Sequence, residues 1–346
     1  MEKDIKKTLL HWYSLNQRVL PWRVKYRNNL PNPYYIFISE YMLQQTSVNT
    51  VKSRFSKFIS RWPTIDNLSK VKNSTILNFW SGLGYYSRAT NLLLAAKKIH
   101  LLYSDKIPEK YEDLISLPGV GDYTAKAILG IAYNKPVMPV DTNVQRILAR
   151  LYGFQSPMIK IKNEIKNKSN AFISKNSSNK LIQAFMDYGS LVCKPKNPDC
   201  TNCLIKTKCI SYEKNLQNII PVKVKFKFKK IKKYSRAYIF YNEKKEIMVR
   251  KRSAKGMLPL MFEVPNDNWV INKRKLVRDN IVLKIKNKMQ FKGLVNYSFS
   301  HFDLETEVFF LKVNKKKFSN QRWIKKSKLN KSGLPTVMKK IVELAL

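Results

Sequence analysis

Apolar residues recur at helical spacing through most of the first 210 residues of this 346-residue chain. The stretch SVNTVKSRFSKFISRWP carries Val, Phe and Ile at intervals of three and four, and a proline ends it. A second stripe runs from Ala89 to Tyr103, and YEDLISLPGVGDYTAKAILGIAY predicts two short helices joined by a Pro-Gly-Val-Gly turn. Residues 160–180, rich in Lys, Asn and Ser, predict a surface loop or a polar helix. We therefore expect this region to be mainly α.

The spacing of apolar residues changes after Cys209. VKVKFKFK, from Val222 to Lys229, alternates strictly and predicts an extended segment, either a strand or a linker lying on one of the domains. RAYIFY, EIMVR and ETEVFFLKV follow as candidate strands, and LPTVMKKIVELAL predicts a closing helix. We expect a helical domain over residues 1–210, a linker over 211–230 and an α+β domain over 231–346.

Charge narrows the classes of function. The chain carries 66 Lys and Arg against 23 Asp and Glu, a formal net charge of +43, so its surface attracts polyanions, nucleic acid first. Codon drift in an AT-rich genome explains part of that lysine excess. No stretch approaches the roughly 20 apolar residues of a membrane span, so we expect a soluble, cytoplasmic protein. We also expect the protein to be a monomer.

Three segments carry candidate chemistry. The turn at residues 117–121, LPGVG, leaves backbone N–H groups bare at the start of the next helix, where they can bind phosphate; many helical hairpins use such turns only structurally. Asp141 in VDTNVQR suits a catalytic carboxylate or an ordinary helix N-cap. Glu40 lies in the apolar stretch ISEYMLQQT. Burial would raise its pKa and let it carry a proton near neutral pH, and the alternative is an exposed or paired glutamate.

All four cysteines fall within 17 residues, CKPKNPDCTNCLIKTKC, with the spacing C-x6-C-x2-C-x5-C. A disulfide is disfavoured in a reducing cytosol. Zinc sites usually pair two short knuckles or add histidines, and neither feature occurs here. Four thiolates in a compact loop suit an iron–sulfur cluster, so the spacing favours that cluster while leaving zinc open. The candidate ligands are Cys193, Cys200, Cys203 and Cys209.

In this order, LPGVG, VDTNVQR and the cysteine loop resemble the helix-hairpin-helix DNA glycosylases related to endonuclease III. Within that group, LPWR, SEYMLQQT, FWSGLGYYSRATNL and LPGVGDYTA resemble the adenine DNA glycosylases of the MutY type. The resemblance covers residues 15–210 densely. It implies a helical catalytic domain whose loop 193–209 holds a 4Fe–4S cluster, followed by a MutT-like (Nudix-fold) α+β domain.

The resemblance also implies the activity: a base-excision-repair enzyme that flips adenine, mispaired with 8-oxoguanine or guanine, out of duplex DNA and hydrolyses its N-glycosidic bond. Such an enzyme would associate with the nucleoid of a bacterium. Glu40 would protonate the base and Asp141 would stabilise the cationic sugar, with Asn143 and Tyr123 supporting the pair. The other assignments are the adenine pocket, Trp22, Arg23, Leu43 and Gln183; contacts to DNA, Gln45, Tyr85, Gly119, Val120 and Gly121; and 8-oxoguanine recognition, Phe299, Ser300 and His301.

Tyr123 separates this interpretation from its rivals. Relatives that also cut the backbone have Lys there, because an amine is needed to form an imine, so Tyr123 predicts a monofunctional enzyme. Lys126, one helical turn on, is a weaker amine candidate. The alternatives are a bifunctional endonuclease III-like lyase and a non-catalytic iron–sulfur DNA-binding protein.

One residue departs from the family pattern, and one matched segment has an alternative interpretation. Thr142 stands where the family usually has Gly, which predicts altered backbone geometry beside Asp141. In the C-terminal domain YSFSHFDLE carries the match, and its alternative is a β-turn with a core phenylalanine. No Glu-rich metal box is present in the sequence, so a pyrophosphatase is not expected.

Overall fold

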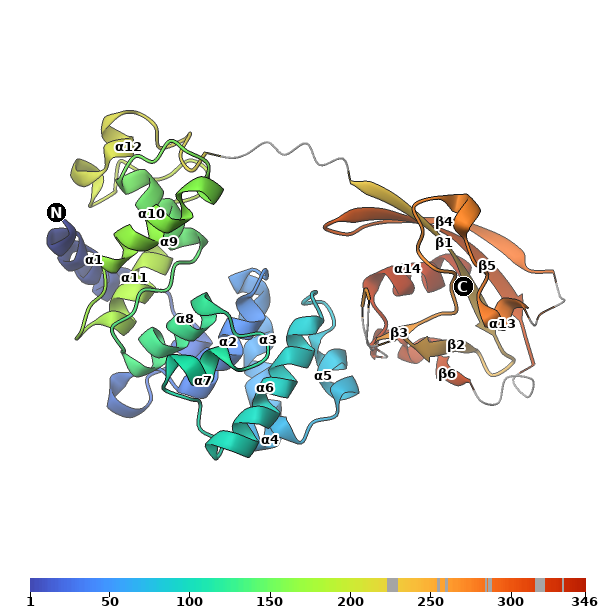
Figure 1. Cartoon of the computed structure of the whole chain (residues 1–346). Coiled ribbons are helices and arrows are strands. Elements are labelled where there is room, and N and C mark those ends of the chain that lie inside the picture. Colours follow the sequence, from blue (N-terminus) through green and yellow to red (C-terminus); the bar gives the residue numbers. More distant parts are fainter. Residues whose placement is uncertain are drawn as a thin grey trace. The chain divides into compact units, whose positions relative to one another are not determined.

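The computed structural model describes residues 1–222, 230–253, 256–258, 261–283, 285, 288–314, 321–331 and 333–346, with the side chains of residues 330 and 331 excepted. The chain divides into two compact units, drawn in Figure 1. Unit 1 comprises Met1–Val71 and Asn91–Phe226, and unit 2 comprises Lys72–Thr90 and Lys227–Leu346. The predicted extended segment VKVKFKFK lies outside the described residues, except for Val222. The predicted domain limits stay a prediction.

Unit 1 is built from helices (Figure 1). The first turn of α6 falls in the part of the chain that clusters with unit 2. The helices are α1 (Glu2–Asn16), α2 (Pro33–Leu43), α3 (Val48–Arg61), α4 (Ile65–Ser69), α6 (Ser87–Tyr103), α7 (Tyr111–Ile115), α8 (Asp122–Tyr133), α9 (Thr142–Leu151), α10 (Met158–Asn170), α11 (Ser178–Leu191) and α12 (Ile210–Glu213), with short 3-10 turns η1 (Pro21–Arg23), η2 (Arg27–Asn29) and η3 (Lys206–Lys208).

The helices begin and end where the sequence signals lie. Ser47 caps α3 by accepting a hydrogen bond from the Thr50 amide, and the apolar stripe of α3 is buried. The LPGVG turn separates α7 from α8, as predicted, and Gly121 is the residue that precedes α8. The Lys- and Asn-rich region 160–180 is helical as far as Asn170, so the polar-helix interpretation is the right one for most of it.

Helix α11 lies at the centre of unit 1 and packs against α1, α8 and α9. Its buried face includes Leu181, Ile182, Phe185 and Tyr188. Helix α9 also contacts α10 and α12. This packing brings α2, the α7–α8 hairpin and α9, which are far apart in sequence, around one region of unit 1.

The first residues of the predicted linker pack on unit 1. Ser211 and Ile220 are buried, and the Arg150 guanidinium donates to the Ile220 carbonyl at 2.8 Å. Residues 211–220 therefore extend the helical unit past the cysteine loop.

Unit 2 combines a mixed sheet with a few helices, and the mainly α plus α+β organisation predicted from the sequence is confirmed. In the sheet, β1 and β5 are parallel, from Ile231 beside Phe302 to Tyr241 beside Lys312, and the other pairs are antiparallel. The strand order is β3-β2-β1-β5-β4, with β6 also paired to β2. The elements are β1 (Ile231–Tyr241), β2 (Glu246–Lys251), β3 (Phe262–Glu263), β4 (Gln290–Ser298), β5 (Phe302–Lys312), β6 (Arg322–Lys325), α5 (Asn73–Trp80), η4 (Lys273–Lys275), α13 (Asn280–Leu283), η6 (Lys326–Lys331) and α14 (Thr336–Ala345).

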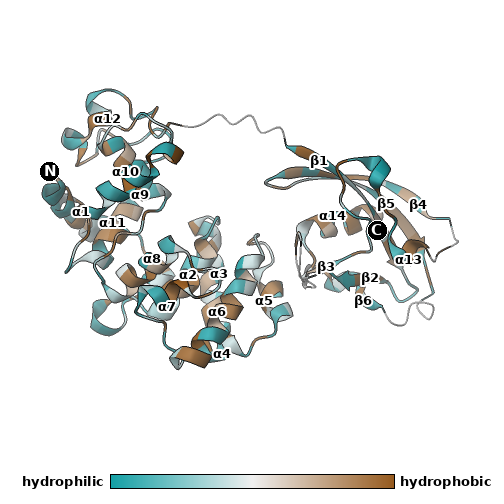
Figure 2. Cartoon of the chain, in the orientation of Figure 1, coloured by the Kyte–Doolittle hydropathy of each residue, from teal (hydrophilic) through white to brown (hydrophobic). Residues whose placement is uncertain are grey.

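Strand β1 contributes residues to two hydrophobic cores, one on each of its faces. Ala237 and Ile239 join the core beneath α14, whereas Tyr238 and Phe240 pack on the opposite face with Val282 of α13. A strand buried on both faces needs a continuous apolar run, which explains the sequence RAYIFY. Hydrophilic and hydrophobic residues lie side by side along the elements of both units (Figure 2), and within the described ranges no helix has the length and apolarity to cross a membrane.

Candidate active site and cysteine loop

A cavity of about 660 Å³ opens in unit 1 between α2, α8, α9, α11 and the segment before α2. It is lined by all four predicted catalytic residues, all four predicted adenine-pocket residues and one predicted DNA contact. These are Glu40, Tyr123, Asp141 and Asn143; Trp22, Arg23, Leu43 and Gln183; and Gln45. Residues from five separate segments therefore converge on one space.

Glu40 is buried on α2, a helix with buried residues from Tyr34 to Met42. Burial raises the pKa of this carboxyl to about 7, and the nearby Asp141 carboxylate adds to the rise. A hydrogen bond from the Tyr123 hydroxyl and the charge of Arg23 oppose it. Glu40 can therefore hold or release a proton near neutral pH.

Asp141 is the N-cap of α9, and the same carboxylate lines the cavity. Oδ1 accepts from the Val144 amide at 2.7 Å, and Oδ2 accepts from Asn143 Nδ2 at 2.7 Å. Burial raises the pKa of Asp141, while these two hydrogen bonds favour its ionised form. The N-cap and the cavity-lining carboxylate, which the sequence analysis treated as alternatives, coexist. Thr142 is the first residue of α9 and is absent from the described residues of positive φ, and its effect on the backbone beside Asp141 stays a prediction.

The orientation of Asn143 depends on a residue that the sequence analysis did not single out. Buried Arg146 donates to Asn143 Oδ1 at 2.8 Å, to the Gly189 carbonyl at 2.6 Å and to the Cys193 carbonyl at 2.8 Å. With its oxygen engaged, the Asn143 amide presents its Nδ2 group to Asp141. Arg146 lies one turn into α9, and only its contacts to distant segments identify it.

Arg23 is held by an anchor that local sequence could not reveal. Its guanidinium donates to both oxygens of Asp187, at 2.7 and 3.0 Å, and Arg18 donates to the same carboxylate through its backbone amide and Nε. Asp187 is fully buried, and the two arginines hold its pKa below the usual value. The three residues come from two segments more than 160 positions apart.

The base-pocket candidates differ in what they offer. Trp22 is buried and meets Phe55 edge to face, with ring centroids 5.4 Å apart. Leu43 is the last residue of α2 and is half-buried. Gln183 donates through Nε2 to the Asn179 carbonyl at 2.9 Å, while its buried Oε1 has no hydrogen-bond partner within the described part of the chain. Gln183 therefore brings a free acceptor to the cavity wall.

The hairpin candidates lie at the start of α8. Gly119 has φ +83°, and a β-carbon there would come within 2.9 Å of Asn91 Cβ, so this position requires glycine. The Tyr41 hydroxyl donates to the Pro118 carbonyl, and Gln44 Nε2 donates to the Gly119 carbonyl at 3.3 Å. Val120 is buried beneath the turn, whereas Gly121 is exposed.

Two predicted DNA contacts share an unusual backbone. Gln45 and Tyr85 are both exposed, and both have positive φ, 55° and 44°. Gln45 lies at the rim of the cavity, just after α2. Tyr85 does not line it and belongs to the segment Lys72–Thr90, which clusters with unit 2.

Lys126, the weaker amine candidate, lies outside this cavity. Its Nζ forms an ion pair with Asp122 at 2.9 Å, one turn away on α8. Its side chain lines a neighbouring cavity instead. The amine is thus engaged by a carboxylate and is not among the described residues that line the cavity with Glu40 and Asp141.

The candidate lesion-reading residues form the turn between β4 and β5 in unit 2. The Phe299 amide donates to the Phe302 carbonyl at 2.9 Å, which closes a tight turn. The Phe299 ring stacks on Phe302 and packs against the core, whereas Ser300 and His301 are exposed at the tip. The alternative of a β-turn with a packed phenylalanine therefore describes Phe299, and it leaves two polar side chains exposed.

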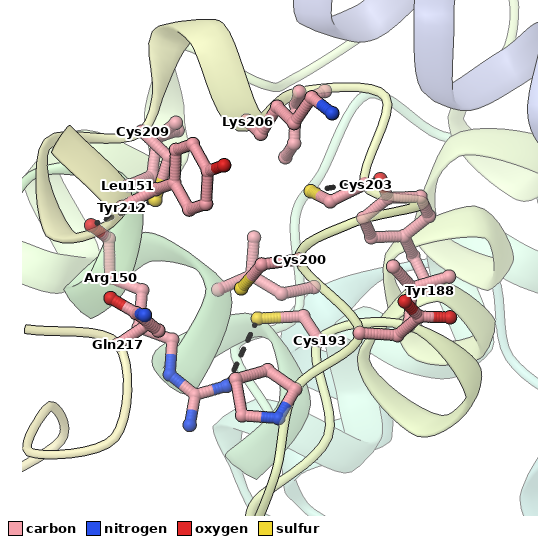
Figure 3. Close-up of a pocket in the computed structure, with 15 residues that line it drawn as sticks. Arg150, Leu151, Tyr188, Cys193, Cys200, Cys203, Lys206, Cys209, Tyr212 and Gln217 are labelled. Carbon is pink, nitrogen blue, oxygen red and sulfur yellow. Dashed lines mark hydrogen bonds between the residues drawn. The ribbon is translucent and has the colours of Figure 1, made fainter. Parts of the chain in front are cut away.

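The four cysteines line one cavity beside α9 and α11, and their sulfur atoms turn toward it (Figure 3). All four are free thiols, so none of them forms the disulfide considered from the sequence. Two donors reach the sulfurs: Arg150 lies 3.3 Å from Cys193 Sγ and the Tyr188 hydroxyl lies 3.2 Å from Cys203 Sγ. Four converging sulfurs with donors around them form a donor set for a thiolate-bound metal centre.

Comparisons with known proteins place this chain among relatives over nearly its whole length. Residues 38–172 match the model of the HhH-GPD superfamily base excision DNA repair protein, and residues 236–344 match a NUDIX domain. The adenine DNA glycosylase of Buchnera aphidicola subsp. Baizongia pistaciae (strain Bp) is 34% identical in an alignment that is 358 residues long. The alignment covers 97% of this chain and 95% of that protein. The one of Buchnera aphidicola subsp. Schizaphis graminum (strain Sg) is 32% identical, covering 97% of each chain.

Two solved structures are similar to somewhat more than half of the chain. A thermostable thymine-DNA glycosylase is similar with a TM-score of 0.55 and 26% identity, covering 62% of this chain and 97% of its own. Endonuclease III in a non-covalent DNA complex is similar with a TM-score of 0.52 and 20% identity, covering 63% of this chain and 99% of its own. The second similarity indicates the shared fold alone.

Proposed function

Because this chain belongs to the adenine DNA glycosylase family, which it matches over nearly its whole length, we propose that it removes adenine mispaired with 8-oxoguanine or guanine from duplex DNA. Family membership makes it a glycosylase that hydrolyses N-glycosidic bonds. The adenine substrate, the mispairs and the absence of strand cleavage are proposals. Localisation to the cytoplasm, in association with the nucleoid, is also a proposal.

The observation that carries the proposal is the pairing of Glu40 with Asp141 in one cavity. Adenine is a poor leaving group unless protonated. Glu40, with its pKa near 7, gives its proton to a ring nitrogen of the base as the bond from C1′ to the base nitrogen breaks. The bonding electrons leave with the base, and positive charge develops on the sugar.

Asp141 is proposed to stabilise that charge. Its carboxylate is fixed by the Val144 amide and by Asn143, so it need not reorganise when the cation forms. Water then adds to C1′ and its proton passes to the solvent, from which the Glu40 carboxylate is protonated again; this completes hydrolysis and leaves an abasic site.

The adenine pocket is proposed from the same cavity. The unpartnered Oε1 of Gln183 can accept a hydrogen bond from the exocyclic amine of adenine. A guanine in the same position would offer a carbonyl instead, so Gln183 would discriminate between them. Trp22 and Leu43 supply apolar surface, and Arg23 is held rigid by Asp187.

A monofunctional enzyme is proposed because none of the described residues that line the cavity is a lysine, the amine needed for an imine. Tyr123 occupies the position beside Glu40, and Lys126 is paired with Asp122 outside the cavity. The proposed reader of 8-oxoguanine is the β4–β5 turn, where Ser300 and His301 are exposed.

A 4Fe–4S cluster is the proposed occupant of the cysteine loop, held by Cys193, Cys200, Cys203 and Cys209. All-sulfur ligation suits iron, and the contacts from Arg150 and Tyr188 would offset the negative charge on the sulfurs. The test is a visible absorption band near about 400 nm with iron and sulfide analysis, since zinc gives no such band.

The deciding experiment is a strand-nicking assay on duplexes with A:8-oxoG, A:G and A:T pairs, with and without alkali. We expect base release from the two mispairs, with strand breaks that appear only after alkali. Breaks without alkali, together with a borohydride-trapped adduct, would favour the bifunctional lyase. Tight binding with no base release would favour the non-catalytic DNA-binding protein.

A further inference from the structure

A second cavity of about 650 Å³ adjoins the candidate active site. Three residues line both cavities, so they form a shared wall: Tyr123, Val140 and Gln145. The rest of the second cavity is lined by the start of α8, the connection from α8 to α9, and one face of α10, elements that Figure 1 draws in green. None of the roles carried over from the family falls on α10.

The second cavity is cationic at its rim. Lys126 of α8 and Lys162 and Lys166 of α10 line it, and its acidic lining residue is Asp122. The Asp122 carboxylate is engaged by Lys126 and accepts from the Tyr111 hydroxyl at 2.9 Å. Lys162 and Lys166 are exposed, and among the described residues neither lies within ion-pair distance of a carboxylate, although the charge of Lys166 helps to lower the pKa of Asp122. Both ammonium groups therefore have room for a phosphate oxygen.

The interior of this cavity is less polar. Apolar side chains come from the α8–α9 connection and from α10, including Met138, Val140, Met158 and Ile165. On α10, Lys162, Ile165, Lys166 and Ser169 recur at intervals of three and four, so one face of the helix supplies both the apolar surface and the two cations. An apolar floor with a cationic rim fits a deoxyribose and its phosphate better than a free base.

We propose that this cavity is a backbone subsite that binds a phosphodiester next to the flipped nucleotide, with Lys162 and Lys166 as its cations. The inference rests on the proposed function. A base in the first cavity leaves its own sugar at Asp141, and the adjacent phosphates lie within one nucleotide of that sugar. Because Tyr123 and Gln145 face both cavities, the strand that leaves the base pocket passes the lysine rim. The grip is independent of sequence, as phosphate contacts are.

The test combines lysine variants with duplexes in which a single phosphate has been made neutral. Duplexes with an A:8-oxoG pair would carry one neutral methylphosphonate at each of the three positions on either side of the adenine. The proteins are wild type, Lys162→Gln/Lys166→Gln, and Lys160→Gln/Lys168→Gln, a control that removes the same charge from the same helix at two positions that do not line the cavity. Affinity and single-turnover base release are measured for each combination.

We expect one position at which the neutral linkage weakens binding by wild type and by the Lys160→Gln/Lys168→Gln control about tenfold, but leaves binding by the Lys162→Gln/Lys166→Gln variant nearly unchanged. The Lys162→Gln/Lys166→Gln variant should also lower the slope of log affinity against log salt by about one, because one phosphate contact is lost. Methylphosphonate effects of equal size in all three proteins would overturn the subsite. A free nucleotide that competes for the protein as strongly as the unmodified duplex does would assign the cavity to soluble phosphates. That result would likewise overturn the subsite. Absence of base release by wild type on the unmodified duplex would instead refute the proposed function.

Discussion

Replacement of Glu40 by Gln separates catalysis from stability because the two effects have opposite signs. Glutamine keeps the shape of the side chain and removes the proton that can be transferred. With general acid catalysis contributing about 10²- to 10⁴-fold, we expect base release to fall by that factor. Binding to the mispaired duplex should stay within about threefold, since the cavity keeps its shape.

The pH profile follows from the pKa of about 7. Only protonated Glu40 is active, so the wild-type rate should be high at acidic pH and fall as pH rises through 7. The protonated share is about one half at pH 7 and about one hundredth at pH 9, so the single-turnover rate should drop about fiftyfold between them. The single-turnover rate of the Glu40→Gln variant should show no such decrease between pH 7 and pH 9.

The stability change has the reverse direction. The carboxyl is raised from 4.5 to about 7, so folding disfavours its ionised form. At about 1.4 kcal/mol per pKa step, ionised Glu40 costs the folded state about 3 kcal/mol above pH 7 and nothing below pH 4. Glu40→Gln should therefore raise the free energy of unfolding by up to about 3 kcal/mol at pH 8 and leave it nearly unchanged at pH 4.

The assay is alkaline cleavage of a labelled A:8-oxoG duplex under single-turnover conditions from pH 5.5 to 9, with urea unfolding at pH 4 and 8. Glu40→Asp serves as the control that keeps the acid but shortens its reach. A flat wild-type profile, or a Glu40→Gln rate within fivefold of wild type, would refute the role of Glu40. A variant less stable at pH 8 than wild type would refute the argument from burial.

Four further predictions concern single residues. Asp141→Asn keeps an N-cap for α9 but loses the negative charge, so base release should be abolished with the helix intact by circular dichroism; a near-normal rate would contradict its role. Tyr123→Lys should gain borohydride-trapped adduct on the mispaired duplex, and no gain would mean that the position does not face the sugar. Asp187→Asn should lower the free energy of unfolding by about 3 kcal/mol at pH 7 by stranding two arginines; because these arginines hold the pKa of folded Asp187 below its usual value, the deficit should begin to shrink only as pH falls below about 4 and should close when the folded carboxylate is protonated, and a deficit that stays constant down to the lowest pH at which wild type is folded would point to packing instead. Ser300→Ala should lower the preference for A:8-oxoG over A:G by about tenfold or less, and an equal loss on both duplexes would remove the turn from lesion reading.

Periodicity alone predicted the main elements. The stripe of α3, the α7–α8 hairpin, strands β1, β2 and β5, and α14 all lie where the sequence pattern put them. Local signals suffice there, because each element has one face to bury or a turn that only glycine fits. The short β3 and α13 carry too few residues to show a period, and long-range contacts define them.

The candidate site was predicted unevenly. Glu40 and Asp141 could be singled out because a carboxylate within an apolar helix and an aspartate before a helix are visible locally. Their meeting in one cavity depends on how α2 packs with α8 and α9, which periodicity does not encode. Arg146 and Asp187 were missed for the same reason: each is an ordinary charged residue in its own helix, and the contacts that distinguish it reach segments more than 40 residues away.

The left-handed backbone at Gln45 and Tyr85 determines how these two side chains can be probed. A residue with a β-carbon holds a φ of +55° or +44° at a cost of about 1 kcal/mol, and alanine would pay the same cost without the hydrogen bonding or ring that the native side chain brings. Glycine adopts this region freely, so Gly at either position would relieve the backbone while deleting the side chain. An alanine scan would therefore compare two strained turns, whereas a Gly and Ala pair at each position divides the measured loss into a conformational part and a contact part.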